Sequence, residues 1–141
     1  MTTKKAISET IIFVTLFFPA IFFIEMELPP FFAAFVEEAF ARLLPLLVVL
    51  YTYHNGINPF TIGIAAGMTF GALEVMTKVM SLGYLSYMMF VPVVFVHIPN
   101  AVLQSVVVNF SYNSRSFSLI PVVYVICVLW HWVYNANLYV V

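Results

Sequence analysis

Five long apolar stretches follow one another along the chain, separated by short segments that contain polar residues, glycine or proline. A helix of about 20 apolar residues is long enough to cross the hydrocarbon core of a bilayer. Turn-forming residues mark the boundaries at Pro29-Pro30, at 54–59, at Gly83 and along the polar run 111–118. The pattern therefore predicts five membrane-spanning helices, at about residues 6–24, 31–53, 60–80, 84–110 and 119–141.

The composition agrees with this pattern. Of the 141 residues, 64% are hydrophobic and 8% are charged, whereas about 25% of the residues of a soluble domain are charged. We therefore expect an all-α, polytopic membrane helix bundle that forms a single integral membrane domain over residues 1–141. The net charge is −1 with five basic residues, which excludes a nucleic-acid-binding surface, because that requires clustered Lys and Arg. Lipid is the first partner expected.

The basic residues near the helix ends predict the orientation of the chain. Loops that carry Lys and Arg tend to face the cytoplasm. Lys4 and Lys5 precede the first predicted helix and Arg115 precedes the last, whereas Lys78 lies at the opposite end of the third. Three residues outweigh one, so we expect a multi-pass membrane protein with its amino terminus in the cytoplasm.

Away from the ends of the predicted spans lie six Glu, Arg and His residues, in positions where charge is unfavourable and by default indicates function. They are Glu37, Glu38, Arg42, Glu74, His97 and His131. Because neighbouring helices run in opposite directions with a rise of 1.5 Å per residue, the connectivity places the two adjacent glutamates, Glu74 and the two histidines roughly 9 to 20 Å below one membrane surface. Four helices are therefore expected to contribute to one polar layer.

The second predicted helix carries three of these residues close together. Adjacent helical residues point about 100° apart, so Glu37 and Glu38 cannot both face one partner. Arg42 follows Glu38 by four residues, the spacing at which Glu and Arg pair on one helix face. We expect a buried Glu38–Arg42 pair, which leaves Glu37 available for chemistry. A structural ion cluster that only locks helix packing is an equally open interpretation.

In the third predicted helix, Gly63, Gly67 and Gly71 recur every four residues. Such a strip of small residues lets another helix approach closely. Glu74 continues the same line, at the depth of the glutamate pair. The strip is interpreted as structural and Glu74 as a candidate site residue.

Polar side chains also share faces of the last two predicted helices. His97, Asn100 and Gln104 form one stripe, and His131 and Asn135 stand one turn apart on another helix. A histidine and an asparagine in this arrangement can present two donors to one oxygen, as an oxyanion site requires.

The order of these motifs resembles the PrsW-type intramembrane proteases and their relatives, the CAAX prenyl endopeptidase and bacteriocin-processing superfamily. The pattern of that superfamily is a glutamate pair with a following basic residue, then Phe-x-x-x-Glu or Phe-x-x-x-His, and a late His-x-x-x-Asn. The matching residues, between about 37 and 135, are Glu37, Glu38, Arg42, Phe70, Glu74, His97, His131 and Asn135. The basic residue stands where the CAAX group has it, whereas the second motif ends in glutamate, as in PrsW.

The resemblance implies an intramembrane endopeptidase that hydrolyses a peptide bond of a membrane-anchored protein or peptide. Glu37 would be the general base that activates water, with Glu38 or Arg42 orienting it. His131 and Asn135 would stabilise the oxyanion. The remaining members of the polar site would be Glu74 and His97.

The role of a metal is left open by the residues. Glu37, Glu74, His97 and His131 are an acceptable set of zinc ligands. However, the sequence lacks the two histidines one helical turn apart that are typical of zinc proteases. We favour a metal-independent glutamate mechanism. Because the chain has fewer spans than many relatives, activity as a homo-oligomer also stays open.

Two other classes of function fit the same residues. One is a small proton- or ion-coupled transporter, because buried Glu and His also build proton relays. No inverted repeat is visible in the chain, which counts against it. The other is a non-catalytic membrane scaffold derived from the protease fold, in which the Glu38–Arg42 pair only fixes packing.

Overall fold

The computed structural model describes residues 2–138, and these are almost entirely helical. In chain order, the elements are α1 (Thr2–Glu25), α2 (Pro30–Glu37), η1 (Glu38–Leu43), α3 (Leu44–Tyr53), α4 (Pro59–Leu82), η2 (Tyr87–Phe90), η3 (Val93–His97), α5 (Ile98–Ser114) and α6 (Leu119–Leu138). Residues 2–138 contain no strand, so the all-α prediction is confirmed.

Four of these helices are long and apolar enough to cross a membrane, over Thr2–Ile24, Pro59–Leu82, Tyr87–Ser114 and Leu119–Asn137. The chain is a membrane protein. The predicted second span is also helical, from Pro30 to Tyr53 through α2, η1 and α3, but its three charged residues, Glu37, Glu38 and Arg42, set it apart from these four.

Some predicted boundaries are corrected by the structure. The polar run 111–118 is not a loop throughout, because α5 continues to Ser114 and buries Ser111 against the bundle. The helix stops at Arg115, whose left-handed backbone (φ 57°) turns the chain so that the N–H of Ser116 also donates to the Ser111 carbonyl. The predicted fourth helix begins at Tyr87, where the Ser86 hydroxyl accepts the N–H of Met88. The last three residues of the predicted fifth helix lie outside the described part of the chain.

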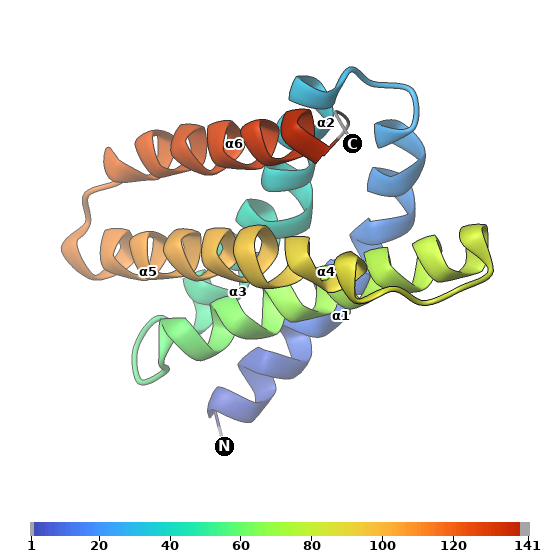
Figure 1. Ribbon diagram of the computed structural model, residues 1–141. Helices are drawn as coiled ribbons and strands as arrows, with labels where there is room; N and C mark the ends of the chain where they lie inside the picture. Colours follow the sequence, from blue (N-terminus) through green and yellow to red (C-terminus); the bar gives the residue numbers. More distant parts are fainter. Residues whose placement is uncertain (1, 139–141) are drawn as a thin grey trace.

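The helices form two sets that cross each other. Figure 1 shows α4, α5 and α6 running side by side, while α1 and the α2–η1–α3 segment cross them at a steep angle. Apolar side chains fill the crossing region, among them Val14, Phe18, Leu46, Phe70 and Ala101. A group of buried polar side chains lies beside this core, where α2–η1–α3 meets α4, α5 and α6.

The glycine strip of α4 brings two helices into backbone contact, as the sequence predicted. A Cβ atom at Gly67 would lie 2.6 Å from the carbonyl oxygen of His97, and one at Gly63 would lie 2.5 Å from the Cα of Val102. Both distances are too short for any side chain. The close approach fixes the position of His97 relative to α4.

Two π-helical turns carry much of the candidate chemistry, and each ends two residues before a proline. Proline lacks an N–H and its ring collides with the carbonyl four residues earlier. The preceding turns are widened to i→i+5 bonds, from Leu44 N–H to the Ala39 carbonyl before Pro45 and from Ile98 N–H to the Val93 carbonyl before Pro99. Such π turns occur frequently at functional sites.

Candidate functional site

Eight polar side chains from different helices are joined by hydrogen bonds and ion pairs; we call this set the polar cluster. Its members are Glu37, Glu38, Arg42, Glu74, His97, Asn100, Gln104 and His131. Six of the seven residues singled out in the sequence belong to it. The predicted polar layer is therefore present, and its side chains converge.

Arg42 lies at the centre of the polar cluster and is completely buried. Its Nη1 donates to Glu38 Oε1 at 2.6 Å and its Nη2 donates to Glu37 Oε1 at 2.9 Å. The prediction that Arg42 pairs with Glu38 is confirmed, but the expectation that Glu37 stays outside the pair is wrong. The π turn explains the difference, because i→i+5 bonding brings residues 37 and 42 onto one helix face.

Glu38 is the most completely satisfied group of the polar cluster. Besides Arg42, its Oε1 accepts from Asn100 Nδ2 at 2.8 Å and from His131 Nδ1 at 2.9 Å, and its Oε2 accepts from Gln104 Nε2 at 2.7 Å. A carboxylate has about four acceptor positions. Four donors from three helices therefore match the number of its acceptor positions. Such a carboxylate is suited to holding the helices together and less suited to reacting with a substrate.

Glu37 is held by longer contacts. Apart from the Arg42 bond, its Oε1 lies 3.5 Å from His97 Nδ1 and its Oε2 lies 3.4 Å from His131 Nε2. Its side chain is buried, with 7% of its surface exposed. Two imidazole rings and a guanidinium therefore surround one buried carboxylate.

His97 connects this carboxylate to the surface of α4. Arg42 Nη2 contacts its Nδ1, and its Nε2 lies 2.5 Å from Glu74 Oε2. Since a guanidinium can only donate, Nδ1 accepts and Nε2 donates to Glu74. The other carboxylate oxygen of Glu74, Oε1, accepts a hydrogen bond from the ammonium of Lys78.

Phe70, the aromatic residue of the predicted Phe-x-x-x-Glu motif, packs against the same groups. Its ring lies 5.2 Å from the His97 ring in an edge arrangement, and the Arg42 guanidinium carbon lies 5.0 Å from its centre. A cation over an aromatic face is attracted by the ring quadrupole. Phe70 therefore supports both residues while excluding water from that side.

Three members or neighbours of this arrangement were not proposed as site residues from the sequence. Asn100 and Gln104 were recognised as a polar stripe with His97, but the sequence does not show that Glu38 is their partner. Lys78 was used only to predict orientation, although its i,i+4 spacing from Glu74 already indicated a pair.

Asn135 is the predicted site residue that the structure does not connect to the polar cluster. It lies half-buried on α6, one turn beyond His131. Within residues 2–138, no hydrogen bond joins its amide to the cluster. Its role in an oxyanion site stays a prediction.

Side chains of α6 also bind carbonyls of the broken helices. Trp130 Nε1 donates to the Phe95 carbonyl at 2.9 Å, and the Tyr124 hydroxyl donates to the Phe35 carbonyl at 2.7 Å. Phe95 is the residue four before Pro99, so its carbonyl has no proline N–H to accept. The α6 helix thus stabilises both interrupted segments that carry site residues.

A metal fits this geometry poorly. Glu37, His97 and His131 each offer a ligand atom within 4.8 Å of the others. Glu74 does not join them, because it binds the opposite side of the His97 ring. Arg42 already contacts both Glu37 Oε1 and His97 Nδ1, and a guanidinium is always cationic. The predicted ligand set would accept a metal only after Arg42 had moved away.

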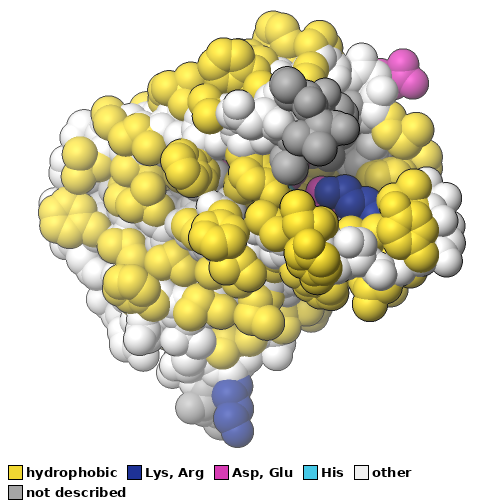
Figure 2. Space-filling model, viewed as in Figure 1, with side chains coloured by type: hydrophobic (Ala, Val, Ile, Leu, Met, Phe, Trp, Pro, Cys, Tyr) yellow, Lys and Arg dark blue, Asp and Glu magenta, His cyan; other side chains and the backbone are white. Residues whose placement is uncertain are grey.

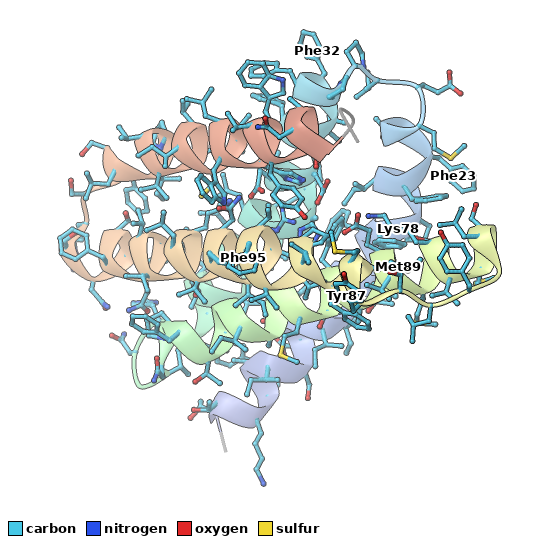
Figure 3. All side chains as sticks on the ribbon, viewed as in Figure 1. Phe23, Phe32, Lys78, Tyr87, Met89 and Phe95 are labelled. Carbon is cyan, nitrogen blue, oxygen red and sulfur yellow. The ribbon has the colours of Figure 1, made fainter. Side chains whose placement is uncertain are left out.

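An apolar cavity of about 240 Å³ lies between α2 and α6, the two helices that end in or carry Glu37 and His131. Its lining consists of Phe31, Phe32, Phe35, Tyr124, Val125, Val128 and Leu129. Phe32 is labelled in Figure 3, on the outside of the α2 end of the molecule. None of these lining residues belongs to the polar cluster.

The fold and the polar cluster together define an all-α membrane protein with a buried, multi-helix ion cluster. In comparisons with family models, with curated proteins and with solved structures, nothing matches the chain.

Proposed function

We propose that the protein is a membrane-embedded endopeptidase, similar to the PrsW-type and CAAX-type proteases, that hydrolyses a peptide bond of a membrane-anchored protein or peptide. The observation that carries the proposal is the surroundings of Glu37, whose carboxylate meets Arg42, His97 and His131 at 2.9–3.5 Å. A positioned carboxylate beside donors that can stabilise negative charge is the arrangement that acyl hydrolysis requires.

In the proposed reaction, Glu37 accepts a proton from water as the oxygen of that water attacks the scissile carbonyl carbon. The negative charge that develops on the carbonyl oxygen is stabilised by Arg42 and by the imidazolium form of His131, which donates Nδ1–H to Glu38 and keeps an Nε2–H on the side of Glu37. Glu37 then returns the proton to the leaving amine. Glu38 does not react, because its four hydrogen bonds hold Arg42, His131 and α5 in place.

The proposal is for a metal-independent mechanism. Arg42 occupies the donor atoms that a metal would need, and it supplies the positive charge there. The apolar cavity between α2 and α6 supports a substrate that approaches from the lipid. The amino terminus is proposed to face the cytoplasm. Lys78 is the one basic residue that opposes this orientation, and its charge is paired with that of Glu74, so it counts less as a signal for the cytoplasmic side.

The test is cleavage by the purified protein in liposomes, with two probes: a single-span reporter that releases a fluorescent domain, and a quenched peptide with a carboxyl-terminal prenylcysteine. Glu37→Gln keeps the shape of the side chain but removes the base. We expect the cleavage rate to fall at least about 100-fold, the usual contribution of a general base.

The matched control is Glu9→Gln. Glu9 accepts a hydrogen bond from Tyr53 at 2.9 Å between α1 and α3, outside the polar cluster. This variant should cleave at the wild-type rate. Cleavage of a probe at equal rates by the wild-type protein and Glu37→Gln would refute the proposal, and so would the absence of cleavage of either probe by the wild-type protein.

A second candidate function is a proton-coupled transporter, favoured by the chain of contacts from Lys78 through Glu74 and His97 to Arg42. Such a chain can carry protons between the surface and the interior. This candidate predicts proton flux in liposomes that is abolished in Glu74→Gln. Flux that persists in the variant, or none in the wild-type protein, would exclude it.

A further inference from the structure

One end of the polar cluster reaches the molecular surface. The Lys78 side chain is 42% exposed and that of Glu74 is 25% exposed, whereas His97 and Arg42 are buried. Figure 3 shows Lys78 on the visible face of the molecule, and in the same view Figure 2 shows a basic side chain emerging among hydrophobic ones with acidic atoms behind it. The pair is therefore the accessible end of a chain that leads to Glu37.

The hydrogen-bonding roles along this chain depend on one another. Arg42 donates to Nδ1 of His97, which favours the tautomer with the ring hydrogen on Nε2. Glu74 favours the same tautomer, because its oxygen accepts that hydrogen from Nε2, so loss of the Glu74 contact lets the other tautomer become populated. Glu74 is itself exposed enough to turn toward water unless its other oxygen is held, and Lys78 holds it.

We infer that Lys78 is a positioning residue: by holding Glu74, it keeps His97 in the form in which Nε2 donates and Nδ1 accepts from Arg42 beside Glu37. This deepens the proposed function, since it assigns to the same site a residue that touches neither the reacting water nor the substrate. It explains why Glu74 and Lys78 are spaced four residues apart, with the glutamate first, which is the favourable order for an ion pair on a helix.

A merely structural pair would behave differently. An ion pair this exposed contributes little to stability. Removing Lys78 should therefore leave the fold intact while changing the state of a histidine that it does not touch. Measuring both stability and the His97 tautomer therefore distinguishes a structural ion pair from a positioning residue.

The experiment is nitrogen NMR of the full chain in lipid nanodiscs with ¹⁵N-labelled histidine. The three histidines are assigned with His54→Gln and His97→Gln. In the wild-type protein we expect His97 to show a protonated Nε2 and an unprotonated Nδ1. In Lys78→Met we expect the two His97 nitrogen shifts to move toward each other, because both tautomers become populated. Lys78→Arg should restore the wild-type shifts.

The matched control is Lys5→Met, which removes an exposed lysine from α1. It should leave the His97 shifts unchanged. Unchanged His97 shifts in Lys78→Met, a wild-type His97 protonated on Nδ1, or loss of the folded state in Lys78→Met would each overturn the inference.

A kinetic arm connects the inference to the proposed function. With either cleavage probe, Lys78→Met should lower kcat at least about tenfold with little change in KM, less than the roughly 10⁴-fold loss known for removing a carboxylate that fixes a catalytic histidine. An unchanged kcat together with shifted His97 resonances would overturn the positioning role in catalysis. Because the NMR arm needs no cleavage, failure of the proposed function would be seen separately, as a wild-type rate in Glu37→Gln.

Discussion

The two ends of the polar cluster are built differently. Around Glu38, deep in the bundle, a guanidinium, an imidazole and two neutral amides from three helices meet one carboxylate. Around Glu74, two donors meet a carboxylate that is a quarter exposed. The comparison indicates that the deep end holds the helices in position, whereas the outer end controls which nitrogen of His97 carries the hydrogen.

The strongest test of the deep end is removal of its cation. Arg42→Met leaves Glu37 and Glu38 buried without their counter-charge. Breaking a buried ion pair from one side costs about 3 to 5 kcal/mol. We expect the free energy of unfolding, measured by titration with SDS in mixed micelles, to fall by this amount. Arg115→Gln, in the loop before α6, is the control, and an equal loss in both variants would contradict the comparison.

A smaller change at the same end removes one neutral donor. Gln104→Leu deletes the bond to Glu38 Oε2 while keeping a side chain of similar volume. A hydrogen bond to a charged group contributes about 1.5 to 3 kcal/mol. The same titration should show a loss in this range. Asn113→Leu, on the exposed end of α5, should change little. A Gln104 variant as stable as the wild type would show that Glu38 does not need all four donors.

The smallest effect on stability is expected at the outer end. Lys78→Met should lower the free energy of unfolding by less than about 1 kcal/mol, because the pair is partly exposed and screened by solvent. The measurement is again the titration with SDS. A loss as large as that of Arg42→Met would remove the distinction between the two ends.

The helices were predictable because their boundaries carry strong signals. Pro29-Pro30, Pro59 and Gly83 interrupt apolar runs, and each lies next to an observed helix end. The alternating direction of the helices was enough to place Glu74, His97 and His131 at one depth. No side-chain detail is needed for that step, which is why the convergence of the polar layer could be predicted.

The partners within the layer were harder to predict. A regular helix with 3.6 residues per turn separates residues 37 and 42, whereas the π turn aligns them. Pro45 was visible in the sequence, but proline can bend, end or widen a helix. The pairing of Asn100 and Gln104 with Glu38 depends on how α5 is rotated, and that rotation is set by the glycine contacts with α4.

The double pairing of Arg42 has a consequence for how the chain is made. Ribosomes synthesise 37–42 well before Asn100, Gln104 and His131 exist, so the charged segment enters the lipid without its later partners. A charged residue at the centre of a span opposes insertion by about 2.5 to 3.5 kcal/mol. Because Arg42 binds both glutamates of its own helix, the segment carries a partner for each carboxylate with it during biosynthesis, which cuts its net charge from −2 to −1.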